Sequence, residues 1–296
     1  MKQTIFKGSG VAIITPMLED GSVNYPVLKE LLEQQIAGGT DAIVICGTTG
    51  EASALNDTEH LDVIEFACAT VNRRLPVIAG TGSNDTRHAV ALSREAKSRG
   101  ADALLQVTPY YNKPSQEGLY QHFRTVSEHS PLPVILYNIP GRSGVNMTAE
   151  TTLRLARDMK NVIGIKEASG DIEQMQRILD NRPEGFLVLS GDDGMTLDLM
   201  RRGGEGVISV AANVFPKRFM QCVGHAKQGD FDRAEEEYRA LDEAVHALFE
   251  EGNPVGAKCA LSMMGKIGPT MRLPLVEGSQ ALREKFSRLI AEYDLR

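Results

Sequence analysis

A single lysine offers the most reactive chemistry in the sequence. Lys166 follows the apolar run Val162-Ile-Gly-Ile165, which is typical of a buried β-strand. Burial disfavours a charged ammonium, and a neutral lysine amine can attack a carbonyl carbon to form an imine. A lysine near a strand end can also extend its ammonium to solvent. On this stretch alone, the catalytic and the structural interpretations are equally good.

Three loops add groups that could assist such a lysine. Gly47-Thr-Thr-Gly-Glu51 offers hydroxyls and backbone amides that can hold a small carboxylate, although such a turn can also simply require glycine. Thr108-Pro-Tyr-Tyr-Asn-Lys-Pro114 is a stiff loop with two tyrosines, of which one is expected to serve packing. Tyr137 ends an apolar run, so its hydroxyl can reach the following loop. In that loop Arg142 offers a bidentate guanidinium for a carboxylate, or it is a surface arginine.

Eight short apolar runs, each followed by an amphipathic stretch, must position these groups. The expected strands are 11–16, 41–47, 76–80, 101–108, 133–138, the run around Lys166, 186–190 and 206–210. Helices are expected to begin near residues 26, 56 or 57, 115, 148, 171, 195 and 216, and another to end near residue 99. Strands that are apolar on both faces and alternate with helices indicate a parallel sheet. Eight units predict a closed (β/α)8 TIM barrel. An open doubly wound sheet is the alternative, but no Gly-x-Gly-x-x-Gly follows the first run.

The chain divides into two expected parts. Residues 1–228 carry the eight units and form the predicted catalytic barrel, and residues 229–296 form an all-helical extension. Apolar residues from Phe231 to Leu248 recur every three or four positions, and two more helices are expected near 253–266 and 278–293. Because no Pro-, Gly- or Ser-rich linker separates the parts, we expect the extension to pack on the barrel.

Composition narrows the classes of function. The 296 residues carry a net charge of −7 without a basic run, which disfavours nucleic acid as a partner. The apolar stretches are strand-sized and the N-terminus lacks a signal core, so we expect no membrane span and a cytoplasmic location. The four cysteines are widely spaced, which favours free thiols. The six histidines show no metal-ligand spacing, so neither a metal nor another cofactor is expected.

In a TIM barrel, the active site lies where the strands end at their carboxyl side. There the predicted fold collects an amine nucleophile, a phenol that can shuttle protons, a turn that can hold a 2-oxo acid, and an arginine for a second anion. These are the parts that an imine-forming lyase needs, because imine formation and hydrolysis each move several protons.

Four stretches resemble the dihydrodipicolinate synthase family, a group of pyruvate-dependent class I aldolases. They are Gly47-Thr-Thr-Gly-Glu51, Tyr110-Tyr-Asn-Lys-Pro114, Tyr137-Asn-Ile-Pro-Gly-Arg142 and Gly164-Ile-Lys-Glu167. The resemblance covers essentially the whole chain, with the motifs in the family's order. It implies a (β/α)8 barrel with a helical extension, usually assembled as a homotetramer of tight dimers.

The resemblance also implies a reaction. Lys166 would form a Schiff base with pyruvate, and the derived enamine would add to the aldehyde of L-aspartate 4-semialdehyde. Cyclisation would release 4-hydroxy-tetrahydrodipicolinate, on the route to diaminopimelate and lysine. Tyr137 would be the central acid and base, connected through Thr48 to Tyr111, which would reach into the site of a neighbouring subunit.

The substrate-binding residues follow from the same resemblance. Thr49 and the backbone at Ile208 would hold pyruvate, and Arg142 would guide the semialdehyde carboxylate. N-acetylneuraminate lyase and 2-keto-3-deoxy sugar acid aldolases belong to the same superfamily and are the alternatives. They differ in the second-substrate region, where Arg142 and Tyr111 resemble the synthase subgroup.

Two other classes of function are less favoured. A non-catalytic 2-oxo acid sensor on the same barrel would not need Lys166, Tyr137, Thr48 and Tyr111 together. A phosphate-binding isomerase would need a glycine-rich turn after the seventh and eighth strands. Gly203-Gly204 precedes the eighth strand, which places it at the opposite end of the barrel.

Some members of the family bind lysine at a dimer interface as a feedback effector. The matching positions are Ala52, Ser53, Asp57, His60, Asn84, His88 and Tyr110. His60, Asn84 and Tyr110 fit the lysine-sensitive pattern. His88 departs from it, because a glutamate usually pairs there with the effector's amine and an imidazole is a poor substitute. We therefore expect weak or absent feedback by lysine.

Overall fold

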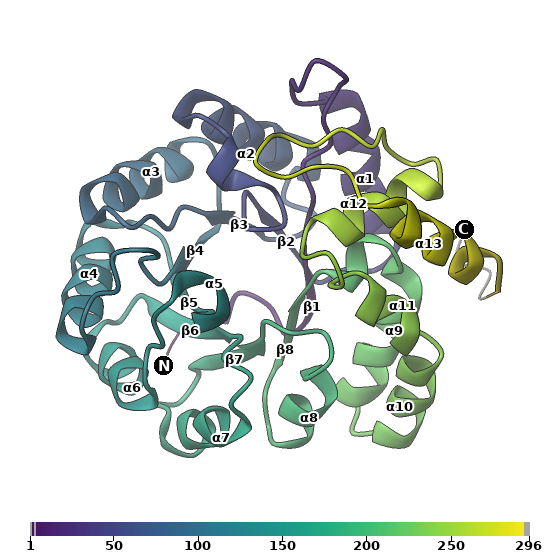
Figure 1. The fold of residues 1–296 in the computed structure, drawn as a ribbon. Coiled ribbons are helices and arrows are strands. Elements are labelled where there is room, and N and C mark those ends of the chain that lie inside the picture. The colour runs from purple at the N-terminus through teal and green to yellow at the C-terminus, as the bar shows by residue number, and fades with distance from the viewer. Residues whose placement is uncertain (1, 3, 293–296) are drawn as a thin grey trace.

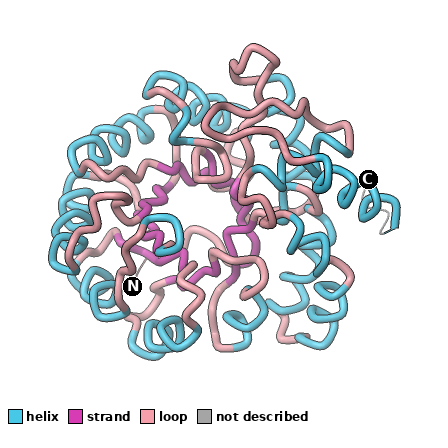
Figure 2. The backbone as a smooth tube through the Cα atoms, in the orientation of Figure 1, coloured by secondary structure: helices cyan, strands magenta, loops and turns pink. Residues whose placement is uncertain are grey.

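The computed structural model describes residue 2 and residues 4–292, and it confirms the predicted (β/α)8 barrel with a helical extension. Eight parallel strands pair in sequence order, and β1 pairs with β8 to close the ring. They are β1 (Gly8–Ala12), β2 (Ala42–Ile45), β3 (Val77–Gly80), β4 (Ala103–Val107), β5 (Val134–Asn138), β6 (Val162–Glu167), β7 (Leu187–Ser190) and β8 (Gly206–Ser209). Helices surround this ring of strands (Figures 1 and 2).

The helices lie between the strands and beyond β8. Those of the barrel are α1 (Tyr25–Ala37), α2 (Asp57–Val71), α3 (Thr86–Ser98), α4 (Gln116–His129), α5 (Pro140–Ser143), α6 (Ala149–Asp158), α7 (Ile172–Asn181), α8 (Thr196–Arg201) and α9 (Pro216–Lys227). Two short 3-10 helices are η1 (Ala52–Ala54) and η2 (Ala211–Asn213). The extension contains α10 (Phe231–Arg239), α11 (Asp242–Ala247), α12 (Val255–Met263) and α13 (Gln280–Glu292).

Local sequence signals explain where helices begin. The Asn56 side chain accepts a hydrogen bond from the backbone amide of Glu59, and the Glu59 carboxylate accepts one from the amide of Asn56. This reciprocal cap satisfies amides that the first turn of α2 leaves without helical partners. Ser115 caps α4 in a similar way through the amide of Gly118. The predicted starts near residues 56 and 115 are therefore confirmed.

Alternation along the strands decides which side chains enter the barrel. In β5, Ile135 and Tyr137 belong to the apolar cluster inside the ring, whereas Leu136 packs with the cluster between strands and helices. In β6, Ile165 packs with the outer cluster, so the next residue, Lys166, faces the interior. The strands thus present Tyr137 and Lys166 to the same enclosed space.

The first strand begins earlier than predicted. The expected strand was 11–16, but β1 spans Gly8–Ala12 and pairs Gly8 with Gly206 of β8. A Cβ atom on Gly206 would lie 1.9 Å from the carbonyl oxygen of Gly8, so only glycine permits this approach of the two backbones. Glycine at a strand start resembles a turn signal in the sequence, which explains the shifted boundary.

The extension lies against one side of the barrel, with α10 beside α9 and α12 in contact with η2 (Figure 1). The apolar pattern from Phe231 to Leu248 is divided between α10 and α11. At the break, the amide of Leu241 bonds to the carbonyl of Tyr238, a three-residue step that keeps the apolar side facing inward. The predicted domain boundary after residue 228 falls between α9 and α10 and stays a prediction, and residues 293–296 of the predicted extension lie outside the described residues.

Candidate active site

The reactive lysine and the phenol lie on neighbouring strands. Tyr137 of β5 and Lys166 of β6 are register partners, and the Lys166 Nζ atom lies 4.2 Å from the centroid of the Tyr137 ring. Both residues are buried, with 5% of the surface of Lys166 and 4% of the surface of Tyr137 exposed. A Cβ atom on Gly191 would lie 3.1 Å from two carbons of the Lys166 stem, so glycine after β7 makes room for the lysine. The amine is therefore confined beside the phenol.

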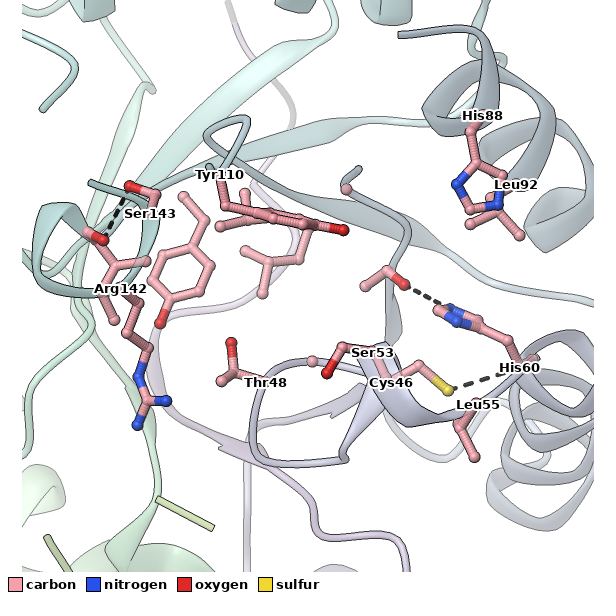
Figure 3. Close-up of a pocket in the computed structure, with 18 of the residues that line it drawn as sticks. Cys46, Thr48, Ser53, Leu55, His60, His88, Leu92, Tyr110, Arg142 and Ser143 are labelled. Atoms are coloured by element: carbon pink, nitrogen blue, oxygen red, sulfur yellow. Dashed lines mark hydrogen bonds between the residues drawn. The ribbon is translucent and has the colours of Figure 1, made fainter. Parts of the chain in front are cut away.

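A cavity of about 390 Å³ opens next to this pair. Tyr137, Thr48 and Arg142 contribute to one end of its lining, and His60 and His88 contribute to the other. Figure 3 shows Arg142 and His88 on opposite sides, with Thr48 between them. Lys166 does not itself line this cavity and is connected to it through Tyr137. The cavity is large enough for a small organic substrate.

The turn after β2 is held in an unusual backbone conformation. Cys46 and Glu51, at its two ends, have φ angles of 54° and 53°, in the left-handed region that non-glycine residues seldom adopt. Thr48 is exposed toward the cavity, whereas Thr49 is 2% exposed. Burial raises the pKa of the Cys46 thiol, so this cysteine stays protonated and is a poor nucleophile. The turn therefore offers hydroxyls rather than a thiolate.

The extension reaches this turn directly. Asn253 lies just before α12, and its Nδ2 atom donates to the hydroxyl of Thr49 over 2.9 Å. Its backbone carbonyl accepts a hydrogen bond from Nη2 of Arg142, also at 2.9 Å. The Oδ1 atom of Asn253 is buried without a hydrogen-bond partner among the described residues. Asn253 thus connects two predicted substrate-binding residues that come from different loops.

Two predicted site residues lie elsewhere. Ile208 of β8 is 1% exposed and packs in the cluster inside the barrel, with Gly10 as its register partner in β1. Tyr111 is 88% exposed, has a φ angle of 74°, and does not line the cavity. Its amide bonds to the carbonyl of Ser143, which fixes the loop while leaving the phenol in solvent. A single chain therefore does not bring Tyr111 to Tyr137.

The far end of the cavity contains most of the predicted effector residues. His60 is buried, its Nε2–H group donates to the carbonyl of Gly80 over 2.8 Å, and burial lowers its pKa. His88 pairs with Asp57, with 3.0 Å between Nε2 and Oδ1. Tyr110 lines the cavity. The Asn84 side-chain amide donates to the carbonyl of Tyr110, which places Asn84 behind it.

A polar network stands behind the reactive pair, on the outer side of the same strands. Asn138 and Glu167 are register partners that follow Tyr137 and Lys166, and Nδ2 of Asn138 lies 3.1 and 3.2 Å from the two carboxylate oxygens of Glu167. The Glu167 carboxylate also accepts from the Gln174 side chain and from the amide of Ser169. Burial raises the pKa of Glu167. This network joins β5 to β6 next to the reactive pair.

Sequence reasoning missed the contributions of Asn253 and of Lys258, whose ammonium lies 2.5 Å from the carboxylate of Glu51. Neither belongs to a motif, and each is far in sequence from its partner in the turn, with Asn253 204 residues from Thr49 and Lys258 207 residues from Glu51. The available signal was only a polar residue and a lysine near the start of the helix expected at 253–266. Within the described residues, no helix has the length and apolar character to cross a bilayer.

Comparisons with known proteins give the chain its relatives. Residues 5–293 match the model of the dihydrodipicolinate synthetase family. A 4-hydroxy-tetrahydrodipicolinate synthase from Parabacteroides distasonis is 47% identical over 290 residues, which cover 98% of both chains. The dihydrodipicolinate synthase from Acinetobacter baumannii, solved in complex with pyruvate, is 44% identical with a TM-score of 0.96, covering 99% of this chain and 100% of that chain.

A third relative concerns assembly. A structure described as the first monomeric dihydrodipicolinate synthase variant is 40% identical with a TM-score of 0.96, and the match covers 99% of this chain and 98% of that chain. The agreement in sequence and in structure extends over the barrel and the extension alike. This chain belongs to the dihydrodipicolinate synthetase family.

Proposed function

We propose that the protein is a lyase that condenses pyruvate with L-aspartate 4-semialdehyde to give 4-hydroxy-tetrahydrodipicolinate, in the diaminopimelate and lysine pathway. The observation that carries this proposal is the position of Lys166, with Nζ 4.2 Å from the Tyr137 ring inside a barrel of this family. A relative of this fold that is 44% identical was solved with pyruvate. The enzyme works in the cytoplasm in this proposal.

The covalent steps begin at the lysine. The neutral Lys166 amine attacks the keto carbon of pyruvate, water leaves, and a Schiff base forms. Loss of a proton from the methyl carbon gives an enamine, whose carbon attacks the aldehyde carbon of the semialdehyde and forms the new C–C bond. The amino group of the semialdehyde then attacks the imine carbon, which closes the ring and frees Lys166. No oxidant or reductant is consumed.

Proton transfers require a relay at the mouth of the barrel. Tyr137, beside Lys166, gives and takes the protons of imine formation and cleavage. Thr48 lines the same cavity and connects Tyr137 to Tyr111 of a neighbouring subunit. The 88% exposure of Tyr111 in one chain suits a side chain that completes another copy's site. We therefore propose a homotetramer of tight dimers, which sedimentation analysis would test.

Substrate carboxylates have separate places in this proposal. Thr49 accepts a hydrogen bond from Asn253, which leaves its own hydroxyl hydrogen to donate to the pyruvate carboxylate, together with backbone at Ile208. Arg142 uses one Nη2 contact on the Asn253 carbonyl, and its other N–H groups face the semialdehyde carboxylate. The two anions thus bind at either side of Tyr137.

Trapping of the Schiff base tests the mechanism. Borohydride reduction in the presence of pyruvate should add one pyruvate-derived group to the chain, and peptide mass mapping should locate it on Lys166. Lys166→Ala should abolish the adduct, and Tyr137→Phe should slow turnover in a folded protein. An adduct on another lysine, such as Lys113, would contradict the mechanism. Turnover of N-acetylneuraminate or of a 2-keto-3-deoxy sugar acid in preference to pyruvate plus semialdehyde would instead identify the protein as one of these two alternative enzymes.

The effector end of the cavity supports a second part of the proposal, weak or absent feedback by lysine. His88 pairs there with Asp57, and this is the only imidazole–carboxylate pair in the cavity lining among the described residues. The imidazole thus occupies the carboxylate that an effector ammonium would need. Titration of L-lysine into the assay should leave activity nearly unchanged. Strong inhibition at low millimolar lysine would contradict this part of the proposal.

A further inference from the structure

A buried ion pair connects the extension to the turn after β2. Nζ of Lys258 on α12 lies 2.5 Å from Oε1 of Glu51, and the two side chains are 1% and 0% exposed. The partners are 207 residues apart in the sequence. Removing two charges from water is unfavourable, and the geometry must be good to compensate for it. Stability alone therefore does not explain this ion pair well, and its position next to the site suggests a role in the site.

Glu51 ends the turn that carries the two site hydroxyls. Its φ angle of 53° is a conformation that a non-glycine residue keeps only when its surroundings hold it there. Besides Lys258, the amide of Arg272 donates to the second carboxylate oxygen of Glu51 at 3.3 Å. The amide of Glu51 bonds to the carbonyl of Thr48. Residues of the extension thus hold the side chain of Glu51, and the backbone amide of Glu51 holds the carbonyl of Thr48.

The opposite side of the turn is held by the barrel itself. The hydroxyl of Thr15 donates to the carbonyl of Gly50 over 2.7 Å, and the amide of Gly50 bonds to the carbonyl of Gly47. The barrel contacts hold the turn's backbone near β1, but they do not reach the carboxylate of Glu51. The carboxylate of Glu51 is therefore restrained from the extension, by Lys258 of α12 and by the amide of Arg272.

The residue before α12 contacts the same turn. Asn253 donates to Thr49 of the turn, and its carbonyl accepts from Arg142 of α5. Lys258 fixes the Glu51 end, and Asn253 fixes the Thr49 side chain. Arg142 is additionally held in α5, whose backbone bonds belong to the barrel. Loss of Lys258 should therefore disturb the turn more than it disturbs Arg142.

We propose that Lys258 is a positioning residue of the site, which acts through Glu51 to fix the Thr48–Thr49 turn against pyruvate and Tyr137. This inference rests on the proposed function, because the turn matters only if it holds a substrate. Lys258 does not contact the reacting atoms. Its removal changes the placement of the hydroxyls and therefore the kinetics with pyruvate, whereas a purely structural lysine would change only the amount of folded protein.

Kinetics of the full-length enzyme with both substrates test this role. Lys258→Met keeps the length of the side chain and leaves the Glu51 carboxylate without its cation. Glu51→Gln/Lys258→Met removes both charges, a replacement that folded proteins usually tolerate. Lys266→Met is the matched control, since Lys266 is a half-buried lysine of the same extension whose ammonium makes no hydrogen bond to the turn among the described residues. Circular dichroism and thermal melting establish that each variant is folded.

In folded Lys258→Met we expect kcat to fall about tenfold and the KM for pyruvate to rise about fivefold, since a small misplacement of positioning groups can cost up to about a hundredfold. The KM for the semialdehyde should change by less than about twofold, because Arg142 keeps its place in α5. The double variant should recover part of the loss, and Lys266→Met should match the wild type.

The inference fails if folded Lys258→Met, or the folded double variant where the single one does not fold, has wild-type kcat and pyruvate KM. It also fails if both KM values rise equally, because the effect would then not be specific to the turn. The proposed function fails separately, if the wild-type protein itself forms no borohydride-trapped adduct on Lys166. Wild-type adduct formation with unchanged Lys258→Met kinetics would reject the positioning role alone.

Discussion

Two buried glutamates near the site are stabilised in different ways. Glu51 is paired with the ammonium of Lys258, and its side chain is 0% exposed. Glu167 is also fully buried, but the donors to its carboxylate are neutral groups of Asn138, Gln174 and Ser169. Neutral donors compensate for the burial of Glu167 only in part, so burial raises the pKa of this carboxyl. Each glutamate connects elements that carry site residues.

The two connections differ in reach. Glu167 joins β5 to β6, neighbouring strands that would pair without it, so it refines a register that the sheet already supports. Glu51 joins the β2 turn to α12, which no strand pairing connects. The ion pair should therefore be the more sensitive of the two to the loss of one partner.

Removal of the cation should produce the largest loss of stability. Lys258→Met leaves the Glu51 charge buried without a partner, and we expect the free energy of unfolding to fall by about 3–5 kcal/mol. Glu51→Gln/Lys258→Met should lose much less, because no charge stays buried. Urea unfolding curves measure both values. Equal losses in the single and double variants would show that packing, rather than the uncompensated charge, accounts for the effect.

Glu167→Gln should have a smaller effect. The glutamine keeps the shape and one acceptor oxygen, but its NH2 group meets donors that bonded to the carboxylate, at a cost of about 1–3 kcal/mol. Tyr137 and Lys166 should keep their register, since the strands still pair. Urea unfolding at neutral pH and borohydride trapping with pyruvate provide the two measurements. A loss greater than that of Lys258→Met would reverse the comparison of the two glutamates.

The smallest expected effect is a pH dependence that belongs to Glu167 alone. Because its pKa is raised in the folded protein, the folded state holds the proton more tightly than the unfolded state does. The resulting stability is complete below the unfolded value of about 4.3 and is lost as pH rises through the folded pKa. The difference in unfolding free energy between wild type and Glu167→Gln should therefore narrow as pH rises over this window. A difference that widens would mean that the buried carboxylate is stabilised in its charged form.

Much of the fold was predictable from local patterns. The eight apolar runs, the Asn56 and Ser115 caps, and the place of Lys166 beside Tyr137 all depend on residues close in sequence or on the regular order of the strands. The start of β1 was missed, because its glycines serve a backbone contact with β8 and not a turn.

The remaining parts of the site depend on contacts that no local pattern encodes. Asn253 and Lys258 reach Thr49 and Glu51 only because the extension folds back over the barrel. Periodicity predicts that α12 is a helix, but it does not predict which side chain meets which loop. Tyr111 is 88% exposed in the single chain and does not line the cavity, so one folded chain does not place it in the site that the resemblance predicts.

The ion pair between Glu51 and Lys258 has a consequence for synthesis of the protein on the ribosome. The turn after β2 is translated early, but its cation is residue 258, which follows 207 positions later. A nascent chain can assemble all eight strands and still have a loosely held substrate turn. Under the proposed positioning role of Lys258, full activity would begin only after α12 has emerged and docked.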